Sequence, residues 1–417
     1  MNGVVLIQST HHKRYLGYFF LGLSSSAFWQ LGVQIVLIEL IALFGVIFLY
    51  VSSKRKQPPE LHNRTLNMLI GFLALWIPTQ VFVDLYNTAK IFETIKSIAT
   101  IIALISLLVC SKYFFILQPI NIEPFLLGYI LSSLPSYFLF PNEYAKTMPW
   151  KFCFSMNCSM LFFWLARKYQ LKKFFYLFLG CVLIFIDFLS DARSLAALTA
   201  LALFFSLLGS QRKKGQLGIS LILLFAAVFS SEVIYSQFAT NGSFGEKAQL
   251  KAISQKNSGP ILLVGRSELL YELQAIRENP IFGKGSKPIA GTETLNRVWN
   301  LESEIGINTK ATAAYYEFGK TQYLPQHSML FTAWLEGGLF AALPWLVILF
   351  LFVRWSLSAS FQDSEMSYLV RFMSITGVWA VLFSPLGTGS RLLTVLALML
   401  GFHCNQVKEF GKVNNAI

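Results

Sequence analysis

The sequence has little charge. Only 13% of its 417 residues are Asp, Glu, Lys or Arg, against roughly 25% in an ordinary soluble domain. Hydrophobic residues make up 55%, and the mean hydropathy is +0.55. These values exclude a disordered chain and a collagen. They also exclude a soluble basic nucleic-acid binder, although the formal net charge is +13, so we expect no nucleic-acid partner.

Metal and cofactor motifs are missing as well. The five cysteines lie in or beside apolar runs and show no CxxC or Cys/His spacing, which argues against a metal site and a disulfide framework. No HExxH, Walker loop or DxD pair occurs, and Gly283-x-Gly285 lacks the third glycine of a dinucleotide fingerprint. We therefore expect neither a catalytic metal nor a cofactor.

Long apolar runs are what the sequence has instead. Several reach about 18 residues or more, the length that spans a bilayer. The pattern predicts an all-α polytopic membrane protein with about 12 transmembrane helices. The predicted spans are 15–29, 31–52, 66–83, 94–110, 124–140, 152–166, 174–190, 194–209, 217–237, 329–353, 368–384 and 391–406.

Basic residues are distributed unevenly between the two sides. With the N-terminus placed inside, eighteen Lys and Arg fall on inside segments and six on short outside segments. The other ten of the 34 lie in one long segment, 238–328. Because cytoplasmic loops carry the excess of Lys and Arg, both termini are predicted to be cytoplasmic and the long segment to lie outside.

The chain then divides into three parts. Residues 1–237 form an N-terminal bundle of about nine spans, and residues 329–417 form about three spans and a cytoplasmic tail. Between them, residues 238–328 form the large outside loop. At the N-terminus, Lys13, Arg14 and the apolar residues after them resemble a signal peptide. Another apolar run follows almost at once, which favours an uncleaved first span.

The outside loop contains one segment typical of a helix. Between Arg266 and Ile276, apolar residues recur at 269, 270, 273 and 276, which is an amphipathic helical spacing. Asn279-Pro280, followed by two glycines, is predicted to end it.

Four side chains on the outer side are candidate site residues. Arg193 follows the seventh span, Arg266 opens the loop helix, His327 precedes the tenth span, and Arg391 opens the twelfth. Arginine presents a planar fork of donors to phosphate oxygens, and a helix N-terminus adds unpaired N–H groups. Histidine is well suited to accept a hydroxyl proton near neutral pH. Together these groups could hold a diphosphate and move a proton.

These residues also have ordinary structural interpretations. An arginine at the end of a span commonly anchors the helix at the interface, and a lone histidine in a loop is commonly solvated. Acids inside predicted spans are costly, and for Glu39 and Glu232 we expect internal ion pairs.

Three further residues are secondary candidates. Asp191 could orient the arginine two residues after it. Glu336 lies nine residues after His327, half a turn out of phase in a continuous helix, so it is expected to serve packing or an ion pair. Arg277 lies eleven residues after Arg266, on the same helix face. It could extend an anion-binding surface or be a solvated residue at the helix end.

Two blocks resemble a known family. The stretch from Gly265-Arg266-Ser267-Glu268-Leu269 to Asn279-Pro280-Ile281-Phe282-Gly283-Lys284-Gly285, and Gln326-His327-Ser328 running to Glu336-Gly337-Gly338, resemble the conserved block of the O-antigen ligase and polymerase superfamily. Arg193 resembles the family's first arginine and Arg391 a further one. The predicted spans and the large outside loop resemble its layout.

The resemblance implies an activity. Family members transfer a glycan from undecaprenyl diphosphate to a saccharide hydroxyl at the periplasmic face of the bacterial inner membrane, without a metal or nucleotide sugar. His327 would activate the acceptor hydroxyl, while Arg193, Arg266 and Arg391 would hold the diphosphate and stabilise the charge as it leaves. The acceptor would be a lipid A core sugar in a ligase or a second lipid-linked glycan in a polymerase. Members commonly have Asn after the histidine, whereas this chain has Ser328.

Two other functions stay open. A lipid-linked oligosaccharide flippase or other transporter would also have many spans and buried charges. Transporters more often show internal repeats and charges near the bilayer midplane, whereas this sequence shows no repeat and has its candidate residues on one face. Transfer onto a protein acceptor, as in a protein O-oligosaccharyltransferase, is chemically identical.

Overall fold

The computed structural model describes most of the chain. It describes residues 15–30, 34–53, 64–116, 122–140, 143–207, 236–242, 249–250, 252–253, 267–308, 323–357 and 364–414. For residues 28–30, 34–35, 52–53, 116 and 406–414 it describes the backbone only.

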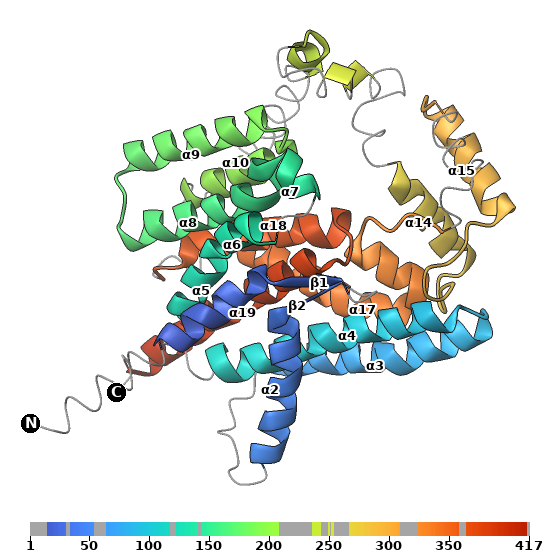
Figure 1. The fold of residues 1–417 in the computed structure, drawn as a ribbon, viewed down its shortest axis with the longest axis horizontal. Coiled ribbons are helices and arrows are strands. Elements are labelled where there is room, and N and C mark those ends of the chain that lie inside the picture. Colours follow the sequence, from blue (N-terminus) through green and yellow to red (C-terminus); the bar gives the residue numbers. More distant parts are fainter. Residues whose placement is uncertain are drawn as a thin grey trace, which may run out of the picture.

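The described chain is almost wholly helical (Figure 1). Within these ranges, strands are confined to one hairpin of β1 (Phe28–Gln30) and β2 (Gln34–Val36). The predicted all-α class is therefore confirmed. After a helix over 15–23 and the 3-10 turn η1 (Ser24–Ser26), the helical elements are α2 (Leu37–Ser53), α3 (Arg64–Tyr86), α4 (Ile91–Ser111), η2 (Lys112–Ile116), α5 (Ile122–Leu131), α6 (Ser133–Phe138), α7 (Glu143–Thr147), η4 (Trp150–Phe154), α8 (Ser155–Lys168), α9 (Lys173–Leu189), α10 (Arg193–Leu207), α14 (Glu268–Glu278), α15 (Thr292–Glu304), α17 (Met329–Leu357), α18 (Ser367–Phe383) and α19 (Thr388–Asn414).

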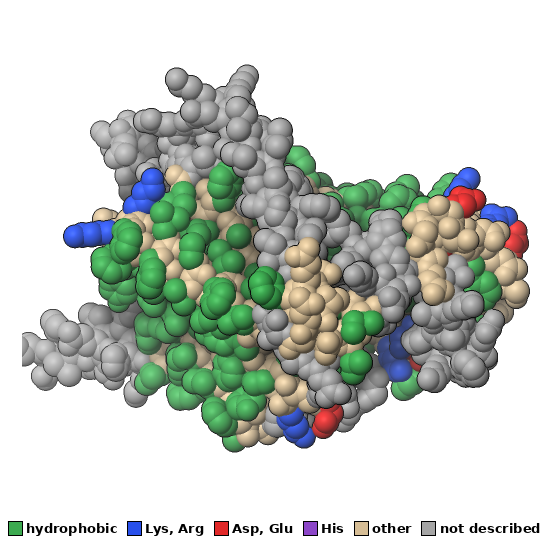
Figure 2. All heavy atoms as spheres, turned by 90° about the horizontal axis from the view of Figure 1, so that it is seen from above, with side chains coloured by type: hydrophobic (Ala, Val, Ile, Leu, Met, Phe, Trp, Pro, Cys, Tyr) green, Lys and Arg blue, Asp and Glu red, His purple; other side chains and the backbone are tan. Residues whose placement is uncertain are grey.

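Three of the described helices are long and apolar enough to cross a membrane. They are α3, α4 with its extension to Phe115, and α17, while α2, α10 and α18 are apolar but shorter. Many large hydrophobic side chains are exposed, among them Phe48, Phe82 and Phe185. In Figure 2 hydrophobic side chains spread over much of the visible face, with charged ones mainly towards its margins. A soluble protein rarely exposes so large an apolar area, so this surface fits a lipid environment.

The first predicted span is shorter than expected. Its helix ends at Leu23, and the turn η1 and strand β1 follow where the prediction continued the span to residue 29. The hydroxyls of Ser24 and Ser26 donate to the backbone oxygens of Leu21 and Leu23 at 2.7 and 2.9 Å. Serine hydroxyls that bond to nearby backbone compete with helix continuation, which accounts for the early end.

The second span, predicted over 31–52, becomes helical only at Leu37, because residues 34–36 form strand β2. The remaining predicted spans within the described residues fall on helices. The segment 124–140 is divided between α5 and α6, because the Ser132 and Ser133 hydroxyls bond back to the carbonyls of Tyr129 and Ile130. Most of segment 217–237 lies outside the described residues. In the outside loop, the helix predicted from the amphipathic spacing is confirmed as α14, and α15 follows it.

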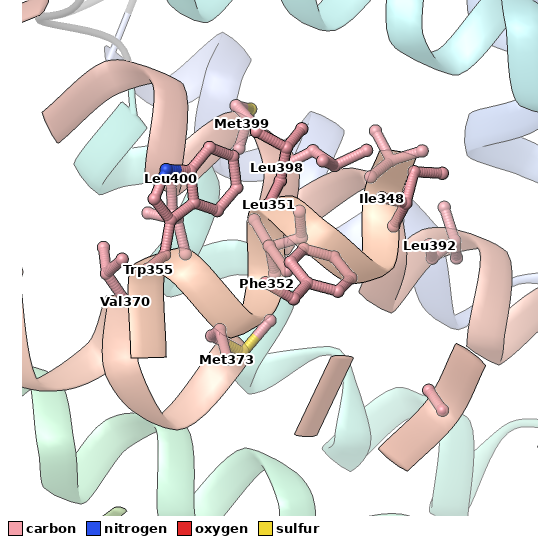
Figure 3. Close-up of a cluster of buried hydrophobic side chains, with 14 of the residues drawn as sticks. Ile348, Leu351, Phe352, Trp355, Val370, Met373, Leu392, Leu398, Met399 and Leu400 are labelled. Carbon is pink, nitrogen blue, oxygen red and sulfur yellow. The ribbon is translucent and has the colours of Figure 1, made fainter. Parts of the chain in front are cut away.

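The centre of the bundle is formed by α17, α18 and α19. Helix α17 packs along α18 and α3, and α10 packs between α9 and α18 (Figure 1). Figure 3 shows how Phe352 and Trp355 from α17, Met373 from α18 and Leu400 from α19 fill the space between these helices. All four side chains are at most 1% exposed. This core fixes the three helices against one another.

The outside loop is locked onto α17 at a kink. Gly338 lies in the middle of α17 with φ +70° and ψ −162°, so the helix is interrupted there. Residues 280–287 run through the gap: the N–H groups of Lys284 and Gly285 donate to the carbonyls of Leu335 and Glu336 at 2.7 and 2.9 Å. The Leu339 N–H donates in turn to the Ile281 carbonyl at 3.0 Å.

Glycine is required on both sides of this contact. A Cβ on Gly283, which has φ +76°, would lie 2.6 Å from the Gly338 nitrogen. A Cβ on Gly338 would lie 2.0 Å from the Ile281 oxygen. Since both clashes are with backbone, neither can be relieved by turning a side chain. The glycines of the two sequence blocks therefore form one interlocked structure.

We predict that Gly283→Ala destabilises the protein more than Gly306→Ala. Both glycines have positive φ, but a Cβ on Gly306 (φ +79°) meets nothing within 4 Å. Each substitution places alanine in a left-handed conformation at a cost of about 1–2 kcal/mol, and Gly283→Ala adds overpacking at about 1–3 kcal/mol. Thermal unfolding of the purified protein in detergent measures the difference. Equal shifts in Tm for the two variants would contradict the interlock.

Candidate active site

The start of α17 presents His327 to solvent. His327 is exposed, and Ser328 after it is fully buried. The Ser328 hydroxyl accepts the N–H of Phe331 at 3.1 Å and donates to the Val381 carbonyl at 3.0 Å. Ser328 is therefore an N-cap residue of α17, and it ties the helix start to α18. A serine can serve in this way where family members commonly have asparagine.

A buried carboxyl group from α14 holds the same turn. Glu272 Oε1 accepts the backbone N–H of His327, and the N–H of Ser328 also bonds to this carboxyl group. Burial raises the pKa of Glu272 to about 8, the two N–H groups oppose the rise, and the carboxylates of Glu268 and Glu336 add to it. The backbone of His327 is thus fixed by the loop helix as well as by α18.

Arg391 is buried in an ion pair. Its Nε and Nη2 donate to the two carboxylate oxygens of Glu39 on α2 at 2.8 and 3.1 Å, and Nη1 donates to the Leu386 carbonyl at 3.3 Å. Both side chains are at most 3% exposed. The internal ion pair expected for Glu39 is therefore confirmed, and the guanidinium is directed at a carboxylate.

Arg193 lies in a small charged group at the start of α10. Its Nε is 3.2 Å from Asp191 Oδ1, and Asp191 Oδ2 accepts from Lys151 Nζ at 2.9 Å. The contact predicted between Asp191 and Arg193 is present. Asp191 has φ +56°, a strained conformation that directs its carboxylate at both cations. Arg193 keeps 19% of its side chain exposed, so it is open to solvent where Arg391 is not.

The starts of α17 and α19 lie side by side. The Thr394 hydroxyl is 3.7 Å from the Met329 sulfur, which joins the first turn of α17 to the second turn of α19. The Ser328–Val381 bond joins them to the end of α18. His327 and Arg391 therefore belong to the same end of the bundle.

Helix α10 begins at this end too. Arg371, near the start of α18, donates to the carbonyl of Phe205, near the end of α10, at 3.0 Å. Because the two helices pack along each other, α10 starts where α18 ends. Arg193 is thus at the end of the bundle that carries His327 and Arg391.

Several residues predicted to be outside also contact the loop. Lys90 Nζ is 3.4 Å from the Tyr323 hydroxyl. Glu93 on α4 pairs with Lys96 at 3.3 Å and with Lys287 of the loop at 3.4 Å. These contacts agree with the predicted sidedness of the loop and of the α3–α4 turn, and they gather further cations at this end.

Glu336 is buried where the loop meets the bundle. It accepts from the Ser97 hydroxyl at 2.9 Å, the Gln326 amide at 2.6 Å and the Lys287 backbone N–H at 3.0 Å. Its contacts join α4, the loop and the residue before His327, so it serves packing, as the phase argument predicted.

The sequence interpretation missed a polar row on α3. Asp84 accepts the Ser286 N–H at 2.6 Å and the Ser286 hydroxyl at 2.7 Å. Gln80 bonds to Asp84, to Ser286 and to Trp76. Trp76, Gln80 and Asp84 recur every four residues on one buried face, and polar groups at helical spacing inside an apolar span were the signal. Glu272 was missed because it falls on the amphipathic face of a loop helix.

Two predicted residues are not brought into this group. Arg266 lies outside the described residues, since α14 is described from Glu268. Arg277 is exposed in the last turn of α14, which fits a solvated residue at the helix end. Among the described residues, no three His, Cys, Asp or Glu side chains form a group that could hold a metal.

An apolar cavity lies beside the buried ion pair. Its volume is about 160 Å³, and it is enclosed by the N-terminal helix, α2, α4, α5 and α19. Ile38 and Leu392, the neighbours of Glu39 and Arg391, line it together with Ala42.

The comparisons with known proteins add no family. No protein-family model, curated protein or solved structure matches this chain. The resemblance to O-antigen ligases and polymerases therefore rests on the residues quoted above.

We predict that Glu39→Gln and Arg391→Met each destabilise the protein by about 3–5 kcal/mol, because each leaves an uncompensated buried charge or donor. The double variant Glu39→Leu with Arg391→Met should be less destabilised than either, since an apolar pair needs no partner. Unfolding in detergent measures the three variants.

The exposed pair of Glu293 and Arg297 is the matched control. Its side chains are 78% and 53% exposed, so Glu293→Gln should change stability by less than about 1 kcal/mol. A Glu39→Gln protein as stable as this control would rule out a structural role for the buried pair.

Proposed function

We propose that the protein is an inner-membrane glycosyltransferase of the O-antigen ligase or polymerase type. It transfers a glycan from undecaprenyl diphosphate to a saccharide hydroxyl at the periplasmic face, in the synthesis of lipopolysaccharide, capsule or exopolysaccharide. About twelve spans, cytoplasmic termini and a periplasmic loop over 238–328 belong to the same proposal.

One observation carries it. Arg193, His327 and Arg391 lie at the starts of α10, α17 and α19, which are at the same end of the bundle, although up to 198 residues separate them in sequence. The loop block and the α17 block of the resemblance also contact each other directly, through Gly283 and Gly338. Sequence blocks that are far apart and meet at one face are typical of a substrate site.

The roles follow from exposure and pairing. His327, exposed and held by its backbone, takes the proton of the acceptor hydroxyl. Arg193, partly exposed, and Arg266 bind the diphosphate. Arg391 faces Glu39, so it contributes to the diphosphate only by exchanging that partner. Its main effect is to hold the starts of α2 and α19 together.

The reaction is a displacement at the anomeric carbon. The acceptor oxygen forms a bond to that carbon as its proton passes to the His327 imidazole. The bond from the anomeric carbon to the diphosphate oxygen breaks, and the electron pair leaves with undecaprenyl diphosphate. The arginine guanidiniums stabilise the charge that develops on the leaving oxygen. No metal or nucleotide sugar takes part in these steps.

A transporter is the second candidate. The buried ionisable groups Asp84, Asp187 and Glu336 are compatible with a translocation path. Asp84 and Glu336, however, accept hydrogen bonds from Ser286 and Lys287 of the loop, which favours a fixed site at one face. A purified-protein assay separates the two functions, because a transporter forms no product from donor and acceptor in detergent.

We predict that His327→Ala lowers the transfer rate by about 10²–10⁴-fold, the range that a general base contributes, with little change in donor binding. The assay measures glycan transfer from undecaprenyl diphosphate by purified protein, with the product separated on a gel. A single transferred chain on the acceptor indicates a ligase, and a ladder on the lipid carrier indicates a polymerase.

His403→Ala is the matched control. His403 is the other histidine in the described part of the chain, and it lies on α19 twelve residues beyond Arg391, away from the site end. Its removal should leave the rate within about twofold of the unchanged protein, as expected for a group outside the site. Full activity of His327→Ala at normal protein levels would overturn the mechanism.

A further inference from the structure

We propose that Glu272 is a positioning residue for His327, and that it acts as a neutral carboxylic acid holding the backbone at the start of α17. Its effect on catalysis rests on the proposed transferase activity. Its effect on the helix start does not, because that contact lies within the described residues.

The bonding of the two oxygens favours the neutral acid. Glu272 is fully buried. Oε1 accepts the His327 N–H, and the Ser328 N–H also bonds to the carboxyl group. Oε2 has no hydrogen-bond partner among the described residues. A carboxylic acid can accept at Oε1 and carry its proton on Oε2, and an unpaired neutral hydroxyl costs less to bury than an unpaired charged oxygen. A buried anion with one bare oxygen is costly.

The charged groups around Glu272 also favour its neutral form. Helix α14 itself contributes Glu268, and α17 contributes Glu336. Helix α15, which packs on the other side of α14, contributes Glu302, and this group accepts from the Tyr271 hydroxyl at 3.4 Å. In the part of the chain that the structure describes, no Lys or Arg side chain is bonded to Glu272.

The same arrangement gives a pH dependence with a defined sign. The pKa of Glu272 is raised to about 8, above its value of about 4.3 in an unfolded chain. The protonated acid therefore stabilises the native contact below the unfolded pKa, and this contribution is lost as the pH rises through 8. Above that pH the anion is buried away from water and repels Glu268 and Glu336. These costs exceed the gain from its two N–H donors, so the contact of α14 with the His327 backbone opens more readily.

Two substitutions at the same position test the proposal. Glu272→Gln keeps an acceptor oxygen without ionising, and Glu272→Ala removes the acceptor. Hydrogen exchange of the amides at 327–331, measured at pH 6.5 and pH 9 and corrected for intrinsic exchange, reports the contact directly. In the unchanged protein we expect protection to fall at least tenfold at the higher pH, because opening the contact releases the proton that the buried carboxyl group holds up to about pH 8.

The variants should then differ. Glu272→Gln should stay protected at both values of pH, and Glu272→Ala should be unprotected at both. The exposed Glu293→Gln on α15 is the control and should behave like the unchanged protein. Protection that persists to pH 9 in the unchanged protein, or a Glu272→Gln protein as unprotected as Glu272→Ala at pH 6.5, would overturn the inference.

The transfer assay supplies the catalytic readout. The rate of the unchanged protein should decline above about pH 8 as the carboxyl ionises, while Glu272→Gln should lack this alkaline decline. Glu272→Ala should lower kcat about tenfold below pH 8 and should lack the alkaline decline, with KM for the donor nearly unchanged, because the binding arginines are untouched. A protein that transfers no glycan under any condition would reject the proposed function, whereas the exchange experiment would still decide the role of Glu272.

Discussion

The interlock between residues 280–287 and the kink of α17 at Gly338 is the contact on which the rest depends. Its hydrogen bonds join backbone N–H groups to backbone carbonyls. The two segments approach so closely that only glycine fits at 283 and 338. Because the loop is held there, α14 lies against the first turns of α17 and brings Glu272 to His327. The same contact carries Ser286 to Asp84 and the Lys287 N–H to Glu336. Without it, the outside loop would have no fixed place over the bundle.

Buried acids make that placement specific. Asp84, Glu272 and Glu336 are each at most 6% exposed, and each accepts hydrogen bonds from a segment distant in sequence. In a low-dielectric interior an unsatisfied polar group is expensive, so the loop has few alternative positions that satisfy all three. Glu39 on α2 joins that helix to α19 in the same way, through its ion pair with Arg391. At the end of the bundle that carries the candidate residues, these acids therefore join segments that are distant in sequence.

Many of the helices could be predicted from the sequence. The apolar runs predicted helices that the structure contains, and the amphipathic spacing predicted α14. The first span was wrong beyond Leu23, because the hydroxyls of Ser24 and Ser26 bond to the backbone and hydropathy does not register that competition. Asp84 and Glu272 were missed since their partners, Ser286 and the start of α17, lie 202 and 55 residues away.

The sequence alone was enough to determine the all-helical class, the apolar surface and the uneven distribution of basic residues, because these depend on interactions between residues that are close in sequence. Length of apolar run and spacing of polar residues act within a few turns of one helix. Tertiary structure alone decided that Arg391 pairs with Glu39, that Arg193 remains partly exposed beside Asp191, and that an acid from α14 supports His327. Those outcomes depend on which helix ends meet, and this is set by packing between segments that no short-range pattern connects.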